Sequence, residues 1–164
     1  THTHHDHIAF LDDFLFYYPF ITILGHPDIL KQLGNNFIGI DHYQNITLGK
    51  MMLTAIHTPG HYADSICIWN IKSNSLFTGD TIFVGRTGRV ISKHSSVKDL
   101  YNSIYEIILK LPEHTIIYPG HHYGYTKKIT IKENIILSDF FRCKDINEFI
   151  KVIDEFEKNR RKKK

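Results

Sequence analysis

The stretch THTHHDH, residues 1–7, places four histidines and one aspartate in a single short segment. Alternate side chains of an extended segment point to the same side, so His2 and His4 are predicted to reach the same metal ion. Asp6 and His7 follow where the chain is expected to turn into a helix, and they would face a neighbouring ion. Imidazole suits zinc and iron, so the segment is typical of a metal site, although alone it also fits a surface pair or a purification-tag remnant.

Three further polar motifs lie at the ends of predicted strands. They are HTPGH at 57–61 with His57 and His61, FTGD at 77–80 with Asp80, and YPGHH at 118–122 with His121 and His122. Loops at one edge of a sheet converge in space, so these side chains are expected to meet the first segment. Taken singly, HTPGH is typical of a turn and Gly-Asp of a strand end. Their joint occurrence in this order favours a metal site in which a carboxylate lies between histidines.

Composition indicates one globular domain over residues 1–164, because the chain is 42% hydrophobic and 13% aromatic and is long enough to bury a core. The net charge is only +3, and much of it lies in NRRKKK (159–164), which is interpreted as a solvated tail. Nucleic acid is therefore not expected as a partner. Cys67 and Cys143 are far apart, which is typical of reduced thiols and favours a cytoplasmic location. No apolar run reaches the ~18 residues of a membrane-spanning helix, so no membrane association is expected.

Hydrophobic periodicity predicts a mixed α and β fold in which helices and strands alternate. Helices are predicted over 6–17, 26–35 and 96–112, with two more that begin at Thr130 and Asp145. Strands are predicted over 21–26, 51–60, 65–71, 75–83 and 115–120. In the last helix one apolar stripe would face the core, formed by Ile146, Phe149, Ile150, Ile153 and Phe156.

Four motifs, taken in order, resemble those of the metallo-β-lactamase superfamily. They are THTHHDH, HTPGHYADS, LFTGDTIFVGRTGR and IYPGHHYG, and together they span residues 1 to about 125. Within that superfamily the sequence is similar to the branch of hydroxyacylglutathione hydrolases (glyoxalase II) and persulfide dioxygenases. The resemblance implies a four-layer αββα sandwich, within the α/β (α+β) class, with metal ions at one edge of its two sheets.

The resemblance also implies which residues bind metal. Two divalent ions are expected, with zinc favoured and iron or manganese as alternatives. One ion would be held by His2, His4 and His61, the other by Asp6, His7 and His121, with Asp80 bridging them. Three more histidines would lie outside the ligand set as orienting or solvent-facing residues, namely His5, His57 and His122.

Two departures from the family pattern are expected to affect the fold. Members of the family carry several strands before the HxHxDH motif, but here the motif begins at residue 1. We therefore expect a fragment that lacks these N-terminal strands and exposes a sheet edge and the apolar face that they cover. The family also places glycines after the Asp-His pair, whereas this chain has DHIAFLDD at 6–13, which would change how that helix packs.

The resemblance favours a thioester hydrolase of the glyoxalase II type. A hydroxide held by two metal ions would attack the carbonyl carbon, and the thiolate would leave without help from a strong protein acid. Asp6 is predicted to orient this nucleophile as the catalytic carboxylate. Arg89 and Tyr123 are predicted to bind a small-molecule thioester, such as a glutathione-linked one, although a solvated arginine and a packed aromatic are the plainer interpretations.

Persulfide dioxygenase is the main alternative, because only about forty residues follow the last metal motif, fewer than the helical domain of glyoxalase II needs. In the dioxygenases a single iron occupies the positions that match His4, His61 and Asp80, a 2-His-1-carboxylate set. The motif residues do not distinguish the hydrolase from the dioxygenase. The hydrolase is favoured because it is the broader class and because a two-metal mechanism uses all seven ligands. A nuclease or a non-catalytic member ranks lower, because no basic insertion lies between Asp80 and His121.

Overall fold

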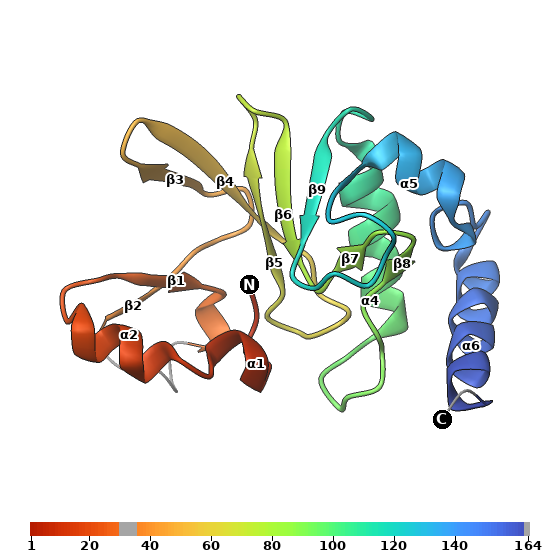
Figure 1. Ribbon diagram of the computed structural model, residues 1–164, viewed down its shortest axis with the longest axis horizontal. Coiled ribbons are helices and arrows are strands. Elements are labelled where there is room, and N and C mark those ends of the chain that lie inside the picture. The colour runs from red at the N-terminus through yellow and green to blue at the C-terminus, as the bar shows by residue number, and fades with distance from the viewer. Residues whose placement is uncertain (30–35, 163–164) are drawn as a thin grey trace.

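A six-stranded sheet forms the centre of the computed structural model, which describes residues 1–29 and 36–162 (Figure 1). Its strand order is β10-β9-β6-β5-β4-β3. The strands are β3 (Asn45–Leu48), β4 (Met51–His57), β5 (Ile66–Asn70), β6 (Ser75–Gly79), β9 (Ile116–Pro119) and β10 (Ile129–Thr130). Neighbours pair antiparallel except β6 and β9, which are parallel. Parallel strands need a long crossover, and helix α4 (Val97–Asn102) lies in it.

A smaller group of elements lies below β3 and β4 in Figure 1. Strands β1 (Ile23–Gly25) and β2 (Phe37–Gly39) form a parallel pair. Helices α1 (His5–Ile8) and α2 (Leu11–Tyr17) lie near them in Figure 1. A 3₁₀ turn, η1 (Pro27–Ile29), follows β1, and a short hairpin of β7 (Ile82–Phe83) and β8 (Arg86–Thr87) follows β6.

The helices of the second half begin at capping residues, as the sequence predicts. Ser96 Oγ accepts a hydrogen bond from Asp99 N at the start of α4. Thr130 and Glu133 form a capping box at the start of α5, and Asp145 Oδ1 accepts two backbone hydrogen bonds in the first turn of α6. Helix α4 is followed directly by the π-helical segment η2 (Ser103–Ile107) and the 3₁₀ segment η3 (Ile108–Lys110). The later helical elements are α5 (Ile131–Leu137), the 3₁₀ segment η4 (Asp139–Phe141) and α6 (Ile146–Lys162).

The main core lies between the six-stranded sheet and two helical regions, the continuous segment from α4 to η3 and helix α6. Strands place alternate residues on one face and helices place every third or fourth residue on one stripe, so the apolar residues of each element face the same layer. Burying one such side chain contributes about 1.5–3 kcal/mol. The buried members include Ile56, Cys67, Leu76 and Ile117 from the sheet, Leu100, Ile104 and Ile108 from α4 to η3, and Phe149 and Ile153 from α6.

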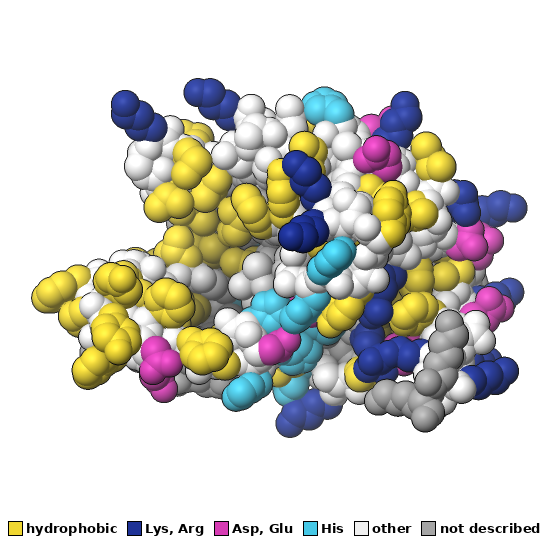
Figure 2. Space-filling view, in the orientation of Figure 1, with side chains coloured by type: hydrophobic (Ala, Val, Ile, Leu, Met, Phe, Trp, Pro, Cys, Tyr) yellow, Lys and Arg dark blue, Asp and Glu magenta, His cyan; other side chains and the backbone are white. Residues whose placement is uncertain are grey.

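The opposite face of the sheet is covered less completely. Its small core contains the buried residues Ile40, Ala55 and Ile66. Phe77 pairs with Ile68, which packs against this small core, yet Phe77 is 45% exposed. Leu48 is 58% exposed. Figure 2 shows hydrophobic side chains gathered on the surface in this part of the molecule. The mixed α and β class is confirmed, and apolar side chains of this sheet face are exposed.

The predicted helix over 6–17 is interrupted at Ala9 and Phe10. Neither α1 nor α2 buries a residue, and Phe14, which lies three residues after Leu11 at helical spacing, is 57% exposed. Helical spacing stabilises a helix mainly when its apolar stripe packs against a core. Here the stripe has little to pack against, so two short helices replace the single long one.

The predicted strand over 75–83 is split by a turn. Strand β6 ends at Gly79, whose φ of +48° lies in the left-handed region that favours glycine. The chain then turns, with Thr81 N donating a hydrogen bond to Thr78 O. Asp80 therefore projects from a turn between β6 and β7 rather than from a continuous strand.

The remaining differences concern boundaries and short elements. The helix predicted over 26–35 is present as η1, and residues 30–35 lie outside the described part of the chain. The short strands β2, β3, β8 and β10 were not predicted, because two to four residues carry too weak a pattern. Residues 159–162, which were interpreted as part of a solvated tail, form the last turn of α6, in which Asn159, Arg161 and Lys162 are exposed and Arg160 is half-buried.

We predict that Gly60→Ala destabilises the fold far more than Gly49→Ala. Both glycines have positive φ, but a Cβ on Gly60 would overlap the backbone of Leu100 in α4, whereas one on Gly49 meets nothing within 4 Å. Gly49→Ala should therefore lower the free energy of unfolding by about 1 kcal/mol, and Gly60→Ala by more than about 3 kcal/mol. Urea denaturation followed by circular dichroism measures both, and equal losses would contradict the close packing of this loop on α4.

Candidate metal centre

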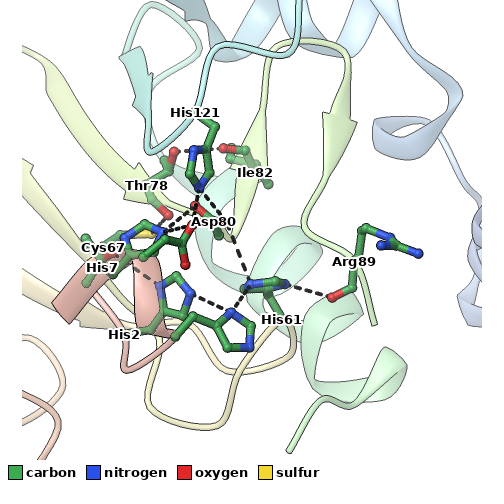
Figure 3. Close-up of polar contacts among 12 residues, drawn as sticks. His2, His7, His61, Cys67, Thr78, Asp80, Ile82, Arg89 and His121 are labelled. Carbon is green, nitrogen blue, oxygen red and sulfur yellow. Dashed lines mark hydrogen bonds and ion pairs between the residues drawn. The ribbon is translucent and has the colours of Figure 1, made fainter. Parts of the chain in front are cut away.

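Four segments that lie far apart in the sequence meet at one edge of the six-stranded sheet. The first is residues 1–7, whose Thr1 O accepts a hydrogen bond from Ile66 N at the start of β5. The others are the loop after β4, the turn after β6 and the loop after β9. Figure 3 shows His2, His7, His61, Asp80 and His121 pointing toward one another from these segments. The convergence predicted from the sequence is thus present in the fold.

His2, His4 and His61 form the first group of candidate ligands. His2 Nε2 lies 2.9 Å from His4 Nδ1, and His61 Nε2 lies 3.0 Å from the same atom. On its other side, His61 Nδ1 lies 2.8 Å from the carbonyl oxygen of Arg89. A proton on Nδ1 that is donated to this carbonyl leaves Nε2 with a free lone pair, as metal-binding histidines require.

Asp6, His7 and His121 form the second group. His121 Nε2 lies 3.1 Å from Asp6 Oδ2, and His7 Nε2 lies 3.9 Å from the same oxygen. The donor atoms of each group lie within 4.8 Å of one another. Each group is therefore narrow enough for its donor atoms to converge on one ion.

Asp80 lies between the two groups. One carboxylate oxygen, Oδ1, is 3.2 Å from His7 Nε2. The other, Oδ2, is 3.5 Å from His121 Nε2 and 3.7 Å from His61 Nε2. A single carboxylate thus contacts histidines of both groups, which is the position that a bridging ligand would occupy.

Burial favours the neutral form of three histidines of this centre, His2, His7 and His61. His2 is only 4% exposed, and its burial, together with the neighbouring imidazoles, lowers its pKa to about 2. Burial also lowers the pKa values of His7 and His61, although Asp80 opposes this shift in both. A neutral imidazole is the form that binds a metal ion.

The donor set fits divalent metal ions. His7 Nε2 and Asp80 Oδ1 are buried and face each other, yet neither atom has a hydrogen-bond partner within residues 1–29 and 36–162. Buried polar atoms of this kind normally have a partner, and a shared cation would satisfy both. Five imidazoles and two carboxylates are ligands that zinc, iron and manganese all accept.

The other predicted histidines lie outside this arrangement. His5 and His122 are exposed. His57 Nε2 lies 2.8 Å from Ala63 O, and its ring stacks on that of His26 at 4.1 Å. None of the three belongs to a candidate metal group in the described residues.

Thr3 and Asp64 hold the first segment in place, and sequence reasoning missed this contact. Thr3 N and Thr3 Oγ1 both donate hydrogen bonds to Asp64 Oδ2, at 3.0 Å and 2.7 Å. Asp64 is only 5% exposed. The buried carboxylate fixes the residue between His2 and His4, and its position three residues after His61 was the available signal.

A cleft of about 330 Å³ opens beside the candidate ligands. Arg89 and Tyr123, which were predicted to bind substrate, both line it. The Arg89 guanidinium is occupied, because Nε and Nη2 donate to the two carboxylate oxygens of Glu157 at 2.7 Å each. Tyr123 is 55% exposed, and its ring lies 5.3 Å from that of His121.

Two further arginines line the same cleft and were not predicted there. Arg86 lies three residues before Arg89 in the GRTGR loop, so its place in the motif was an available signal. Arg160 comes from the last turn of α6 and was assigned to the solvated tail. Its position depends on how α6 packs, which the sequence pattern does not give.

The chain belongs to the metallo-beta-lactamase superfamily, whose family model matches residues 1–121. A protein of Bacillus subtilis (strain 168) named "Probable polyketide biosynthesis zinc-dependent hydrolase PksB" is 29% identical over 153 residues, which cover 92% of this chain and 67% of that protein. A hydroxyacylglutathione hydrolase of Tolumonas auensis is 32% identical over 132 residues, covering 76% of this chain and 47% of the relative.

Solved structures show the same fold. The crystal structure of ETHE1 from Myxococcus xanthus superimposes with a TM-score of 0.72 at 26% identity, covering 82% of this chain and 58% of that one. The hydroxyacylglutathione hydrolase and ETHE1 fit the hydroxyacylglutathione hydrolase and persulfide dioxygenase branch that the motifs indicate. The chain spans about half to two thirds of the length of these relatives. Among the described residues, no helix is both long enough and apolar enough to cross a membrane.

We predict that Asp80→Asn abolishes tight metal binding, whereas His122→Ala leaves it nearly unchanged. Asp80 contacts histidines of both groups, and its charge would offset the repulsion between two cations, so its loss should weaken zinc binding by about 100-fold or more. His122 is exposed and next to His121. Zinc titration against a chromophoric chelator measures both variants, with circular dichroism to check folding. Equal losses would mean that the ligand in PGHHYG is misassigned by one residue.

Proposed function

We propose that this chain carries the metal centre of a thioester hydrolase of the glyoxalase II type. The observation that carries the proposal is the position of Asp80, which contacts histidines of both groups and thereby links the seven candidate ligands. A two-metal hydrolase uses such a set in full. Zinc is proposed for both sites, with iron or manganese as alternatives, and the zinc-dependent hydrolase named among the relatives supports this choice.

Divalent ions bound in this centre would polarise the substrate carbonyl and make a water molecule acidic enough to react near neutral pH. The residues of the chain keep the centre ready for this chemistry. Burial keeps the His2 imidazole neutral, and the Arg89 carbonyl orients His61. Asp6, whose side chain is 59% exposed and lines the cleft, is proposed to orient the attacking water. Thiolate is a weak base, so the leaving group needs no strong protein acid.

The proposed substrate is a small-molecule thioester, with a glutathione-linked one as the first choice. The relatives named hydroxyacylglutathione hydrolase support this choice. Tyr123 and Arg89 are proposed to face the thiol portion, because both line the cleft beside the ligands. A cytoplasmic location is also proposed, since Cys67 and Cys143 are free and buried, as in proteins of reducing compartments.

A mono-iron persulfide dioxygenase is the second candidate. His4, His61 and Asp80 line the cleft together, and His61 Nε2 lies close to both of the other ligands. Two histidines and one carboxylate on one face are the ligand set that leaves positions open in non-haem iron oxygenases. This function would leave the second group, Asp6, His7 and His121, without a metal to bind, which favours the hydrolase.

The two candidates are separated by oxygen consumption. Protein loaded with zinc or iron is offered S-lactoylglutathione with and without air, and separately glutathione persulfide with an oxygen electrode running. We expect thiol release from the thioester at the same rate in both atmospheres, because hydrolysis needs only water. Oxygen uptake with the persulfide and no cleavage of the thioester would overturn the proposal.

Metal content provides an independent check on the same protein. Elemental analysis should find two metal ions per chain, and Asp80→Asn should lose metal and thiol release together. A single iron per chain in an active protein would favour the dioxygenase. Absence of metal after reconstitution would contradict both candidates.

A further inference from the structure

Asp64 is a buried carboxylate that the proposed chemistry does not use. It is 5% exposed and lies in the loop between β4 and β5. Its Oδ2 accepts two hydrogen bonds from Thr3, one from the backbone N at 3.0 Å and one from Oγ1 at 2.7 Å. Its Oδ1 is also buried, and it has no hydrogen-bond partner among residues 1–29 and 36–162.

This carboxylate lacks an ion-pair partner in the described part of the chain. No Lys, Arg or His side chain of that part lies within 4.0 Å of the Asp64 oxygens. Two hydrogen bonds from Thr3 replace only part of the hydration that burial removes, and buried charges in proteins are normally paired or lie beside a metal ion. The position of Asp64 is therefore favourable only with a cation that these side chains do not supply.

Asp64 connects the two segments that carry the first group of candidate ligands. Its hydrogen-bond partner Thr3 stands between His2 and His4 in the chain, and His61 belongs to the same loop as Asp64. The second group comes instead from helix α1 and the loop after β9. A change at Asp64 is therefore expected to act on the first group and not on the second.

We propose that Asp64 is a positioning residue for the first metal ion and supplies a buried negative charge that this ion balances. This inference rests on the proposed two-metal centre. Imidazole is a neutral ligand, so among the candidate ligands only Asp80, which both ions would share, offsets the charge of an ion in the first group. Charges in a medium of low dielectric interact more strongly than charges in water. Asp64 would thus favour occupation of the first group from behind its ligands.

Asp64→Asn tests the charge, and Asp28→Asn is its matched control. Both variants exchange one carboxylate oxygen for an amide nitrogen, but the Asp28 side chain is 88% exposed, where solvent and salt screen its charge. Thr3→Val is a second comparison, because it removes the hydrogen bond from Oγ1 and keeps the carboxylate. Titration of metal-free protein with zinc against a chromophoric chelator measures binding without any dependence on turnover.

We expect Asp64→Asn to weaken one of the two zinc-binding steps by about 10-fold or more, and Asp28→Asn to change both by less than about twofold. Thr3→Val should cost less than Asp64→Asn, because it retains the charge. Unchanged zinc affinity in Asp64→Asn would overturn the proposal. An equal loss in Thr3→Val would also overturn it, because the hydrogen bond and not the charge would then set the affinity.

A double-mutant cycle identifies which ion is affected. In a His4→Ala background, which removes a ligand of the first group, Asp64→Asn should cause no further loss of zinc affinity. In a His121→Ala background, which removes a ligand of the second group, the loss of about 10-fold should persist. The reverse pattern would contradict the assignment of Asp64 to the first group.

The stability of the metal-free protein distinguishes this role from a merely structural one. A buried charge without a partner is unfavourable before metal binds, so Asp64→Asn should raise the melting temperature of metal-free protein or lower it by less than about 3 °C. The same variant should reduce the rise in melting temperature that zinc causes. A larger drop without metal would overturn the proposal, because the carboxylate would then stabilise the fold by itself.

Turnover separates this proposal from the proposed function. If no thioester is cleaved but zinc binding depends on Asp64, the hydrolase proposal fails and the role of Asp64 stands. If thioesters are cleaved and Asp64→Asn binds zinc as tightly as the unmodified protein, the role of Asp64 fails and the hydrolase stands.

Discussion

The carboxylate of Asp80 is the contact on which the candidate site depends. It meets histidines that come from three separate parts of the chain, His7, His61 and His121. Backbone pairing places it there, because Gly120 N donates to Gly79 O at 2.8 Å and so brings the ends of the parallel strands β6 and β9 together. Without a charge at this position, the two histidine groups would have no shared ligand, and two cations would repel each other at short range.

Arg89 couples this centre to the C-terminal helix. Its carbonyl oxygen accepts from His61, while its guanidinium binds Glu157 in α6. The same residue therefore orients a candidate ligand and attaches the helix that brings Arg160 to the cleft. A shift of α6 would therefore change the wall of the cleft. It would also move Arg89, whose carbonyl oxygen contacts His61.

Sequence patterns anticipated that the candidate ligands would converge, but they missed parts of the fold around them. The motifs pointed to a metal site, their resemblance to the family implied the seven candidate ligands, and the fold brings these seven together. The helix over 6–17 was predicted as one element and is two, and neither of the two buries a residue that would hold it against the core. The end of β6 at Gly79 was also missed, because a left-handed φ is not visible in hydrophobic alternation.

The sequence by itself determined which residues are candidate ligands, their order along the chain and the superfamily to which the chain belongs, because these depend on local motifs with fixed spacing. Only the tertiary structure decided that Arg89 is paired with Glu157 and that Arg160 faces the cleft. Both facts depend on where α6 packs, which is set by long-range burial of side chains such as Phe149 and Ile153 against the core. A run of basic residues looks the same in a sequence whether its helix ends in solvent or beside a binding site.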